Sequence, residues 1–280
     1  MNIFSAIKTG SETLKEKSIM TAHLDSEILM AKALNKDRKF ILLNSNNILK
    51  KEQFDSFQNL IKKRSARQPV AYLTNKKFFW NFEFYVTSDT LIPRPDTELI
   101  VEKVFQLIKH KKKIQILDIG IGSGCILLSI LKERKNIYGT GIDISKKCLN
   151  IAEKNAISLH VKNRLKLFKS DIDKFTLGKY DLIISNPPYI NKHNLKYLDK
   201  DISLFEPRLA LDGGLDGLSE IRKVIKRSSE LIKKNGKLIL EIGFDQKNKV
   251  IKLLKKEGFY INSTEKDLAN NDRCIVSTKI

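Results

Sequence analysis

The segment 114–124 constrains the fold of this 280-residue chain more than any other stretch. It starts with the mostly apolar run from Ile114 to Ile119 and continues through glycines spaced as G-x-G-x-G at positions 120, 122 and 124. Apolar residues with helical spacing follow it. A strand, a glycine-rich turn and a helix start together form a nucleotide-binding βα unit. The segment therefore predicts an α/β protein with a ligand at the end of this strand.

The glycine spacing also limits the kind of ligand. Enzymes that bind dinucleotides use G-x-G-x-x-G, whereas this chain has G-x-G-x-G with the acidic Asp118 just before it. A carboxylate there disfavours a pyrophosphate and favours an amino group, so a methionine-type ammonium and carboxylate fits the loop better. Glycine lets the backbone approach such a ligand closely. The predicted cofactor-binding loop consists of Gly120, Ile121, Gly122, Ser123 and Gly124.

Two further acidic residues follow the next two predicted strands. Asp143 ends the run 137–142 and lies about 20 positions after Gly120, where an acidic residue can accept hydrogen bonds from ribose hydroxyls. Asp171 follows the run 165–168 and is placed to meet an adenine amino group. Both residues are therefore expected at the cofactor.

A stiff turn follows the apolar run from Tyr180 to Ile184. Pro187 and Pro188 end that strand and carry no N–H, so the local backbone offers mainly carbonyl acceptors. The Asn186 side chain adds another acceptor, and Tyr189 supplies a flat apolar face with a polar tip. Such a turn suits a planar NH2 group, although a Pro-Pro pair also ends strands in ordinary loops.

These candidate residues share one position in the fold. Each follows a predicted strand, and the carboxyl ends of parallel strands meet at the edge of a sheet where ligands bind. A glycine-rich loop alone is weak evidence, but its combination with Asp143 and Asn186 is specific. We therefore expect a single site at this edge.

Composition narrows the class of protein. The chain has no apolar run near the roughly 20 residues of a membrane span and begins without the apolar core of a signal peptide. Its three cysteines are widely spaced, which predicts neither a metal site nor disulfides and favours the cytoplasm. The net charge of +20 permits nucleic-acid binding. Because lysines are spread along every segment, codon bias is the alternative, and direct nucleic-acid binding is not expected. The run 111–113 is read as a solvated loop.

The amino-terminal region reads as helical. Apolar residues follow helical spacing in two stretches, and helix stops at 44–47 and 68–69 predict a bundle of about four helices. Asp25 and Glu27 are expected as charges on a helix surface. The bundle either supports the rest of the chain or docks a substrate. The aromatic stretch 78–86, with a turn at Asn81, predicts a β-hairpin.

Residues 92–98 contain two prolines and precede a predicted helix from Glu98 to His110. Asp96 or Thr97 is expected to cap that helix, and this reading is favoured over a role for Arg94 in closing a pocket. Further on, 191–207 is expected as an ordered loop or lid. Glu241 is a catalytic candidate at the end of a strand, but the reading as an exposed acid there is favoured.

The chain resembles the release factor glutamine methyltransferase family over essentially its whole length. The resemblance rests on the helical start, the hairpin, residues 92–98, 118–124, 186–189 and 205–207, all in family order. A sister family that methylates a glutamine of a ribosomal protein shares the Asn-Pro-Pro-Tyr turn but looks different around 92–98.

The resemblance implies an S-adenosylmethionine-dependent protein-glutamine N5-methyltransferase that works without a metal. Its acceptor would be the glutamine of the Gly-Gly-Gln tripeptide in class I peptide chain release factors, and S-adenosylhomocysteine would be the second product. The resemblance implies catalytic roles for Asn186, Pro187 and Tyr189. It implies that the whole turn from Asn186 to Tyr189 binds the substrate. The resemblance also implies that Asn186 and Ile172 bind the cofactor. Ile172 stands where the family often has an aromatic residue beside the adenine.

The expected fold is a seven-stranded Rossmann-like class I methyltransferase domain at 93–280, preceded by a helical bundle at 1–75 and a hairpin linker at 76–92. We expect a monomer without membrane association. Two rival functions remain open at this point. One is an amino methyltransferase for a nucleic-acid base or a ribosomal-protein glutamine, and the other is a catalytically silent RNA- or ribosome-binding module.

Overall fold

The computed structural model describes residues 1–108 and 113–280. Lys111 and Lys112 of the predicted solvated loop, and the predicted helix end at His110, lie outside them. The chain forms two compact units. The first comprises Met1–Lys76 and Asp199–Phe205, and the second comprises Lys77–Leu198 and Glu206–Ile280. The predicted domain boundaries placed 199–205 with the second part of the chain, so this segment is a departure from the expected division.

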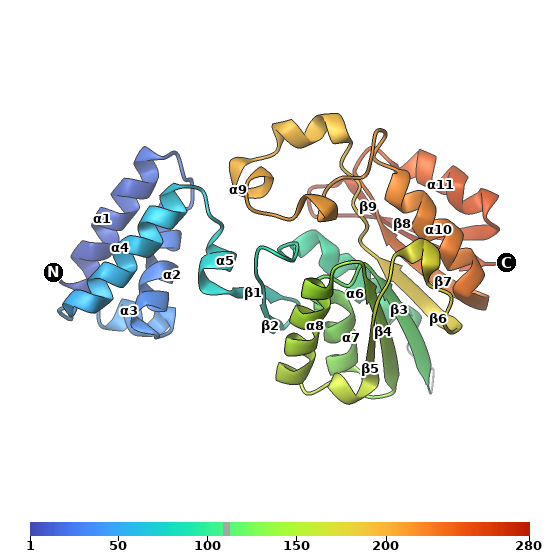
Figure 1. Cartoon of the computed structure of the whole chain (residues 1–280), viewed down its shortest axis with the longest axis horizontal. Coiled ribbons are helices and arrows are strands. Elements are labelled where there is room, and N and C mark those ends of the chain that lie inside the picture. The colour runs from blue at the N-terminus through green and yellow to red at the C-terminus, as the bar shows by residue number, and fades with distance from the viewer. Residues whose placement is uncertain (109–112) are drawn as a thin grey trace. The chain divides into compact units, whose positions relative to one another are not determined.

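The first unit, all of which the structure describes, is a helical bundle (Figure 1). Its helices within the first 76 residues are α1 (Ile3–Glu16), α2 (Ala22–Leu34), α3 (Arg38–Leu43), α4 (Lys51–Ser65) and the short α5 (Val70–Thr74). The short α9 (Lys200–Ser203) belongs to the same unit. The predicted bundle is thus present. α3 ends directly before the predicted stop at 44–47, and α4 ends at Ser65, three residues before the predicted stop at 68–69.

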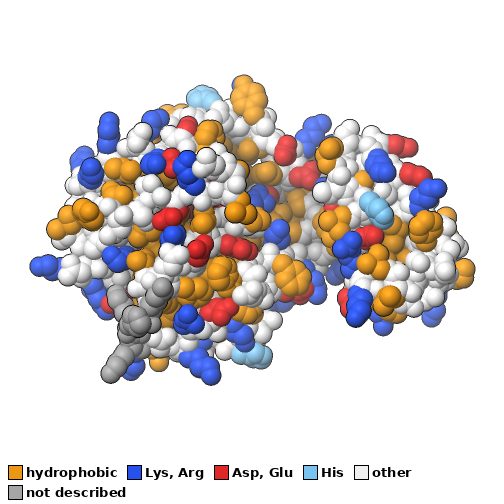
Figure 2. All heavy atoms as spheres, turned by 180° about the vertical axis from the view of Figure 1, so that it is seen from behind, with side chains coloured by type: hydrophobic (Ala, Val, Ile, Leu, Met, Phe, Trp, Pro, Cys, Tyr) orange, Lys and Arg blue, Asp and Glu red, His pale blue; other side chains and the backbone are white. Residues whose placement is uncertain are grey.

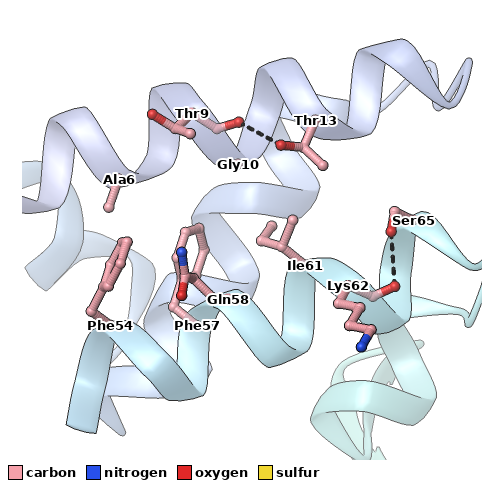
Figure 3. Close-up of a pocket in the computed structure, with 10 residues that line it drawn as sticks. All are labelled: Ala6, Thr9, Gly10, Thr13, Phe54, Phe57, Gln58, Ile61, Lys62 and Ser65. Carbon is pink, nitrogen blue, oxygen red and sulfur yellow. Dashed lines mark hydrogen bonds between the residues drawn. The ribbon is translucent and has the colours of Figure 1, made fainter. Parts of the chain in front are cut away.

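Gly10 allows α1 to pack closely against two neighbouring helices. A Cβ on Gly10 of α1 would lie 2.8 Å from the Phe57 ring of α4 and 2.8 Å from the Ser26 hydroxyl of α2. A shallow hollow of about 270 Å³ lies along the same pair, α1 and α4 (Figure 3). The bundle is therefore built around a close helix contact that needs a residue without a side chain.

Asp25 and Glu27 are buried, so their prediction as surface charges is wrong. They are 6% and 7% exposed. Asp25 accepts a hydrogen bond of 2.7 Å from Arg64, and Glu27 accepts one of 2.8 Å from Arg38. Arg64 also pairs with Asp201 of the 199–205 segment. These carboxylates are buried because arginines from other helices neutralise them.

The second unit starts with the predicted hairpin, formed by β1 (Lys76–Phe79) and β2 (Phe82–Tyr85). Its turn contains Trp80, which has a φ of 55°, and Asn81. Asn155 holds β2 in place, because its side chain exchanges hydrogen bonds of 2.8 and 3.0 Å with the Tyr85 backbone. The same amide donates to the Ser123 carbonyl at 2.8 Å, which ties the hairpin to the glycine loop.

Among the described residues, seven strands form one sheet in the order β5-β4-β3-β6-β7-β9-β8. Strands β3 to β7 are parallel, and β9 pairs antiparallel with both β7 and β8. This confirms the expected Rossmann-like class. The strands are β3 (Ile114–Ile119), β4 (Ile137–Asp143), β5 (Leu165–Lys169), β6 (Tyr180–Ser185), β7 (Ile232–Glu241), β8 (Phe259–Lys266) and β9 (Asp272–Lys279).

Helices cover both faces of this sheet (Figure 1). One group is α6 (Glu98–Leu107), α7 (Cys125–Glu133) and α8 (Lys146–Ser158), and the other is α10 (Ser219–Leu231) and α11 (Lys247–Lys256). With both faces covered, the central strands are almost entirely apolar. The core beside α10 and α11 includes Leu117, Ile183 and Leu238, and all three are 0% exposed. The ligand site is thereby confined to the ends of the strands.

The face of the molecule in Figure 2 shows no specialised basic patch among the described residues. On the side seen in Figure 2, lysine and arginine side chains are scattered among other residues instead of gathering in one patch. Across residues 1–108 and 113–280, no helix has the length and apolar character needed to cross a membrane.

Candidate active site

A cavity opens where the strand order of the sheet reverses. β3 and β6 are neighbours, but β4 and β5 continue on one side while β7 continues on the other. In open α/β sheets, ligands bind at this switch point, beyond the carboxyl ends of the strands. The cavity has a volume of about 560 Å³. Its wall contains most of the predicted site residues: Gly120, Ile121, Gly122, Ser123, Asp143, Asp171, Ile172, Asn186, Pro187 and Pro188.

The glycine loop between β3 and α7 presents its backbone to the cavity. Gly120 and Gly122 have φ values of 75° and 55°, which side chains rarely allow. A Cβ on Gly120 would meet nothing within 4 Å, and one on Gly122 only the Gly120 carbonyl at 3.9 Å. These two glycines therefore leave open space that a ligand can fill. Gly124 is different: it is outside the cavity wall, and a Cβ there would lie 2.7 Å from Leu128.

Asp143 ends β4 and braces the loop from the opposite side. Its two carboxylate oxygens accept backbone hydrogen bonds from Gly122 at 3.0 Å and from Ser145 at 2.9 Å. Burial raises its pKa, against the effect of these hydrogen bonds. A carboxylate has about four acceptor positions, so Asp143 retains capacity for ribose hydroxyls.

Asp118 is the acidic residue just before the loop, and it is 1% exposed. Neither of its oxygens has a hydrogen-bond partner among the described residues. Burial, and secondly the charge of Asp143, raise its pKa to about 8. Asp118 does not line the cavity itself, but its buried carboxyl directly precedes the loop of open glycines that does, and this arrangement fits a ligand with a positive charge. The residues present thus fit the amino acid end of S-adenosylmethionine.

The Asn-Pro-Pro-Tyr turn follows β6 as predicted, and its first three residues line the cavity. The Asn186 side-chain nitrogen donates to the Thr97 hydroxyl at 3.2 Å. Tyr189 does not line the cavity. Its hydroxyl lies 3.3 Å from Glu241 and 3.4 Å from Arg273, and burial raises its pKa. This placement favours a role for Tyr189 in holding the turn over direct contact with an acceptor group.

Two interpretations of single residues from the sequence are corrected by the structure. Glu241 is 2% exposed and not a surface acid, and burial raises its pKa to about 7. Thr97 occupies the N-cap position of α6 as predicted, but its side chain makes no capping hydrogen bond there and instead accepts one from Asn186. The first turn before α6, Pro95–Thr97, is a 3-10 helix, and α6 itself ends at Leu107.

The 92–98 and 205–207 segments meet at the cavity. The Glu206 carboxylate is 1% exposed and accepts hydrogen bonds from Arg94 and from the Ile92 backbone. Arg94 and Pro207 line the cavity beside these contacts. The ion pair therefore fixes part of the wall, which favours the pocket role of Arg94 that the capping reading had set aside.

Sequence reasoning missed part of the wall. Ser88, Asp89 and Leu91 follow the hairpin, and Glu220 and Lys223 lie on α10. No motif marks them, because their place depends on how the hairpin and α10 pack. Cys125 and Cys148 also line the cavity, and all three cysteines carry free thiols.

The sheet order and the cavity at its switch point define a Rossmann-like methyltransferase. Residues 96–203 match the family described as methyltransferase small domain. A methyltransferase from Pyrococcus furiosus has the same fold with a TM-score of 0.56, at 19% identity over 78% of this chain and 98% of that one. The ribosomal protein L11 methylase from Lactobacillus delbrueckii subsp. bulgaricus has a TM-score of 0.50, at 18% identity over 67% and 81%.

The curated relatives are more specific. Residues 5–74 match the PrmC N-terminal domain. The release factor glutamine methyltransferase of Caulobacter vibrioides is 33% identical over 100% of this chain and 97% of its own length. That of Buchnera aphidicola subsp. Baizongia pistaciae is 37% identical over 100% of both chains. The chain belongs to the release factor glutamine methyltransferase family, which confirms the resemblance.

Proposed function

We propose that this protein transfers a methyl group from S-adenosylmethionine to the side-chain nitrogen N5 of a glutamine. The acceptor is the glutamine of the Gly-Gly-Gln tripeptide in class I peptide chain release factors. Membership of the family supports this function. The observation that carries it is the placement of the glycine loop and of the Asn186 turn on the wall of one cavity.

On this proposal, one side of the cavity holds the cofactor. The open backbone of Gly120 and Gly122 accommodates its amino acid end, with Ile121 and Ser123 on the same wall and Gly124 starting α7 behind them. Asp143 accepts from the ribose hydroxyls. Ile172, which is 8% exposed, covers an adenine face by apolar contact without stacking. When bound, the cofactor supplies a methyl group on a positively charged sulfur.

The Asn186 turn receives the acceptor amide. An amide nitrogen is a poor nucleophile because its lone pair is delocalised. The Asn186 side-chain oxygen and the Pro187 carbonyl would accept its two hydrogens and draw the nitrogen towards tetrahedral geometry, with Pro188 completing the wall. The same fixed dipoles stabilise positive charge that develops on the nitrogen. Alignment of the two reactants supplies much of the rate.

The proposed substrate sets the cellular context. Release factors act on ribosomes, so the enzyme works in the cytoplasm, and its three buried free thiols are consistent with a reducing compartment. We propose a monomer that meets the release factor directly. The bundle at 1–75 and the hairpin linker at 76–92 would either support the methyltransferase domain at 93–280 or dock this substrate.

A methyl-transfer assay with labelled S-adenosylmethionine tests the proposal. Unmodified release factor, the same factor with its Gly-Gly-Gln glutamine replaced, ribosomal protein and nucleic acid are offered in parallel. Label on the intact release factor alone is the expected result. Label on nucleic acid or on ribosomal protein instead would overturn the proposed substrate.

The roles of two residues separate in the same assay. Asn186→Ala is expected to reduce turnover far more than cofactor affinity, because Asn186 holds the acceptor. Asp143→Ala is expected to do the reverse, because Asp143 holds the cofactor. Cofactor affinity is measured by calorimetry. An equal loss of cofactor affinity in both variants would contradict this division.

A further inference from the structure

A buried glutamine links three loops at the carboxyl edge of the sheet, and cofactor binding does not explain it. Gln246 directly precedes α11 and is 6% exposed. Its Nε2 donates to the backbone carbonyls of Tyr189 at 2.9 Å and of Gly217 at 3.0 Å, and its Oε1 accepts from the Gly243 N–H at 2.9 Å. These partners lie after β6, before α10 and after β7. The side chain therefore connects the turn from Asn186 to Tyr189 with two other loops.

The three partners fix the orientation of this side chain. A carbonyl can only accept and an N–H can only donate, so the NH2 group must face Tyr189 and Gly217 while the oxygen faces Gly243. The amide has two hydrogens, and each has its own carbonyl. A side chain of similar length without an NH2 group could not make both bonds. The position therefore requires the hydrogen-bonding groups of glutamine and not only its size.

The loop before α10 lies too close to the turn for a side chain to fit between them. A Cβ on Gly213 would lie 2.8 Å from the Tyr189 Cα, and one on Gly217 would lie 2.6 Å from the Tyr189 carbonyl oxygen. The Gly213 N–H also donates to the Ile190 carbonyl at 2.8 Å. Because Gln246 bonds to both Tyr189 and Gly217, it holds this close contact together.

The Tyr189 carbonyl lies two residues beyond the Pro187 carbonyl, which is proposed to accept a hydrogen of the acceptor amide. Pro187 and Pro188 carry no N–H, so neither can hold the turn by donating a backbone hydrogen bond. The Pro188 ring also fixes its own φ, which leaves fewer rotations between these two carbonyls to absorb a displacement. A shift of the Tyr189 carbonyl therefore moves the Pro187 carbonyl with it.

We propose that Gln246 is a positioning residue which, through the Tyr189 carbonyl, holds the Pro187 carbonyl where it meets the acceptor nitrogen. The inference rests on the proposed function for its kinetic consequence, but the three hydrogen bonds do not depend on any substrate. Gln246 lies outside the cavity wall, so it acts on the acceptor only through the turn.

Two substitutions of similar length test this in the methyl-transfer assay. Gln246→Met cannot donate and is expected to lower kcat by about 10- to 100-fold at every pH, the scale of a misplaced catalytic group. Gln246→Glu has a hydrogen to donate only when it is protonated, and burial favours that form. Its deficit in kcat, relative to the wild type at the same pH, should therefore grow as the pH rises from about 6 to 9. Full activity of Gln246→Met, or a Gln246→Glu deficit that does not grow with pH, would overturn the proposal.

Two controls separate positioning from general damage. Ser277→Ala removes another buried side-chain hydrogen bond to a backbone carbonyl, that of Leu238 at 3.3 Å, and is expected to leave kcat unchanged. Calorimetric titration should give about one cofactor site per chain, and a Kd within about threefold of the wild type, in all three variants, since Gln246 bonds to neither the glycine loop nor Asp143. A loss of cofactor sites that matches the loss of kcat would show damage to the fold and overturn the proposal.

Hydrogen exchange without substrate keeps this inference separate from the proposed function. The segment 189–192, followed by mass spectrometry, contains the Ile190 N–H, which donates to the Leu211 carbonyl at 3.1 Å. At one pH, its amides should exchange faster in Gln246→Met than in the wild type, and at the wild-type rate in Ser277→Ala. Equal exchange in Gln246→Met and the wild type would refute the positioning role even if the enzyme methylates release factor. Wild-type protein with the expected exchange but no methyl transfer would refute only the proposed function.

Discussion

Two buried carboxyl groups, Asp25 in the first unit and Asp118 in the second, have opposite surroundings. In the first unit, Asp25 pairs with the buried Arg64. Burial lowers the pKa of that guanidinium, but the hydrogen bonds that it donates to Asp25 and Asp201 raise its pKa overall. In the second unit, Asp118 is equally buried, but its carboxyl has no side-chain or backbone hydrogen bond within residues 1–108 and 113–280, and burial raises its pKa to about 8. A buried charge is tolerated when it is fully paired and becomes costly when its partner is removed, whereas a buried carboxyl without a partner lowers stability and is a candidate for contact with a ligand.

The largest effect is expected where a paired carboxyl loses its partner. Arg64→Met leaves Asp25 buried without a counter-charge and is expected to lower the free energy of unfolding by about 3–5 kcal/mol. Urea denaturation of the full chain measures the change. A loss below about 1 kcal/mol would mean that the pair is not a structural element of the bundle.

Neutralising Asp118 should raise the free energy of unfolding instead of lowering it. The pKa of Asp118 is 3.8 in the unfolded chain and about 8 in the folded one, so the folded state binds more protons between these values. Stability is therefore lost as the pH rises from about 4 to 8. Asp118→Asn removes this loss and is expected to raise the free energy of unfolding at pH 8.5 by at least about 2 kcal/mol, since each pKa unit corresponds to about 1.4 kcal/mol.

The cofactor supplies the control for Asp118→Asn. At pH 4 the variant and the wild type should be equally stable, because both side chains are then neutral. Saturating S-adenosylmethionine should stabilise the wild type more than the variant in thermal unfolding, since tighter binding to the folded state raises its stability further. A variant that is less stable than the wild type at pH 8.5 would show that Asp118 has a structural partner after all.

The smallest effect is expected for a pair that water reaches. Arg38 bonds to Glu27, but its side chain is 52% exposed. His23 also lies 3.8 Å from Glu27. Arg38→Met should therefore lower the free energy of unfolding by less than about 1 kcal/mol, because solvent screens the exposed guanidinium. A loss as large as that of Arg64→Met in the same urea experiment would show that exposure does not distinguish the two arginines.

The same carboxyls show what sequence patterns can predict. The parallel strands and the glycine loop are encoded locally by apolar runs and glycine spacing, so β3, β4 and β6 were predicted with nearly correct bounds. The burial of Asp25 depends on Arg64, which lies 39 positions away, and on Asp201, which lies 137 positions from Arg64. No local pattern reports such a partner, and an acid then looks exposed by default.

The site residues also divide into those that a local sequence pattern predicts and those whose partners lie far away in the sequence. Gly120, Asp143 and Asn186 follow strands, and the topology of the sheet brings them to one edge without further information. Thr97 was assigned to a helix cap because capping is a local rule, but its partner Asn186 lies 89 positions further along the chain. Arg94 and Glu206, separated by 112 positions, became visible as a pair only in the structure.

The membership of residues 199–205 in the first unit affects how the protein can be divided. The chain passes from one unit to the other at residues 76, 198 and 205, so a single cut does not separate them. A gene fragment that encodes residues 1–76 would lack Asp201 and leave Arg64 with only one of its two acidic partners. The amino-terminal helices therefore cannot be transferred between proteins as one continuous segment. A chimera with a relative would have to exchange residues 1–76 and 199–205 together.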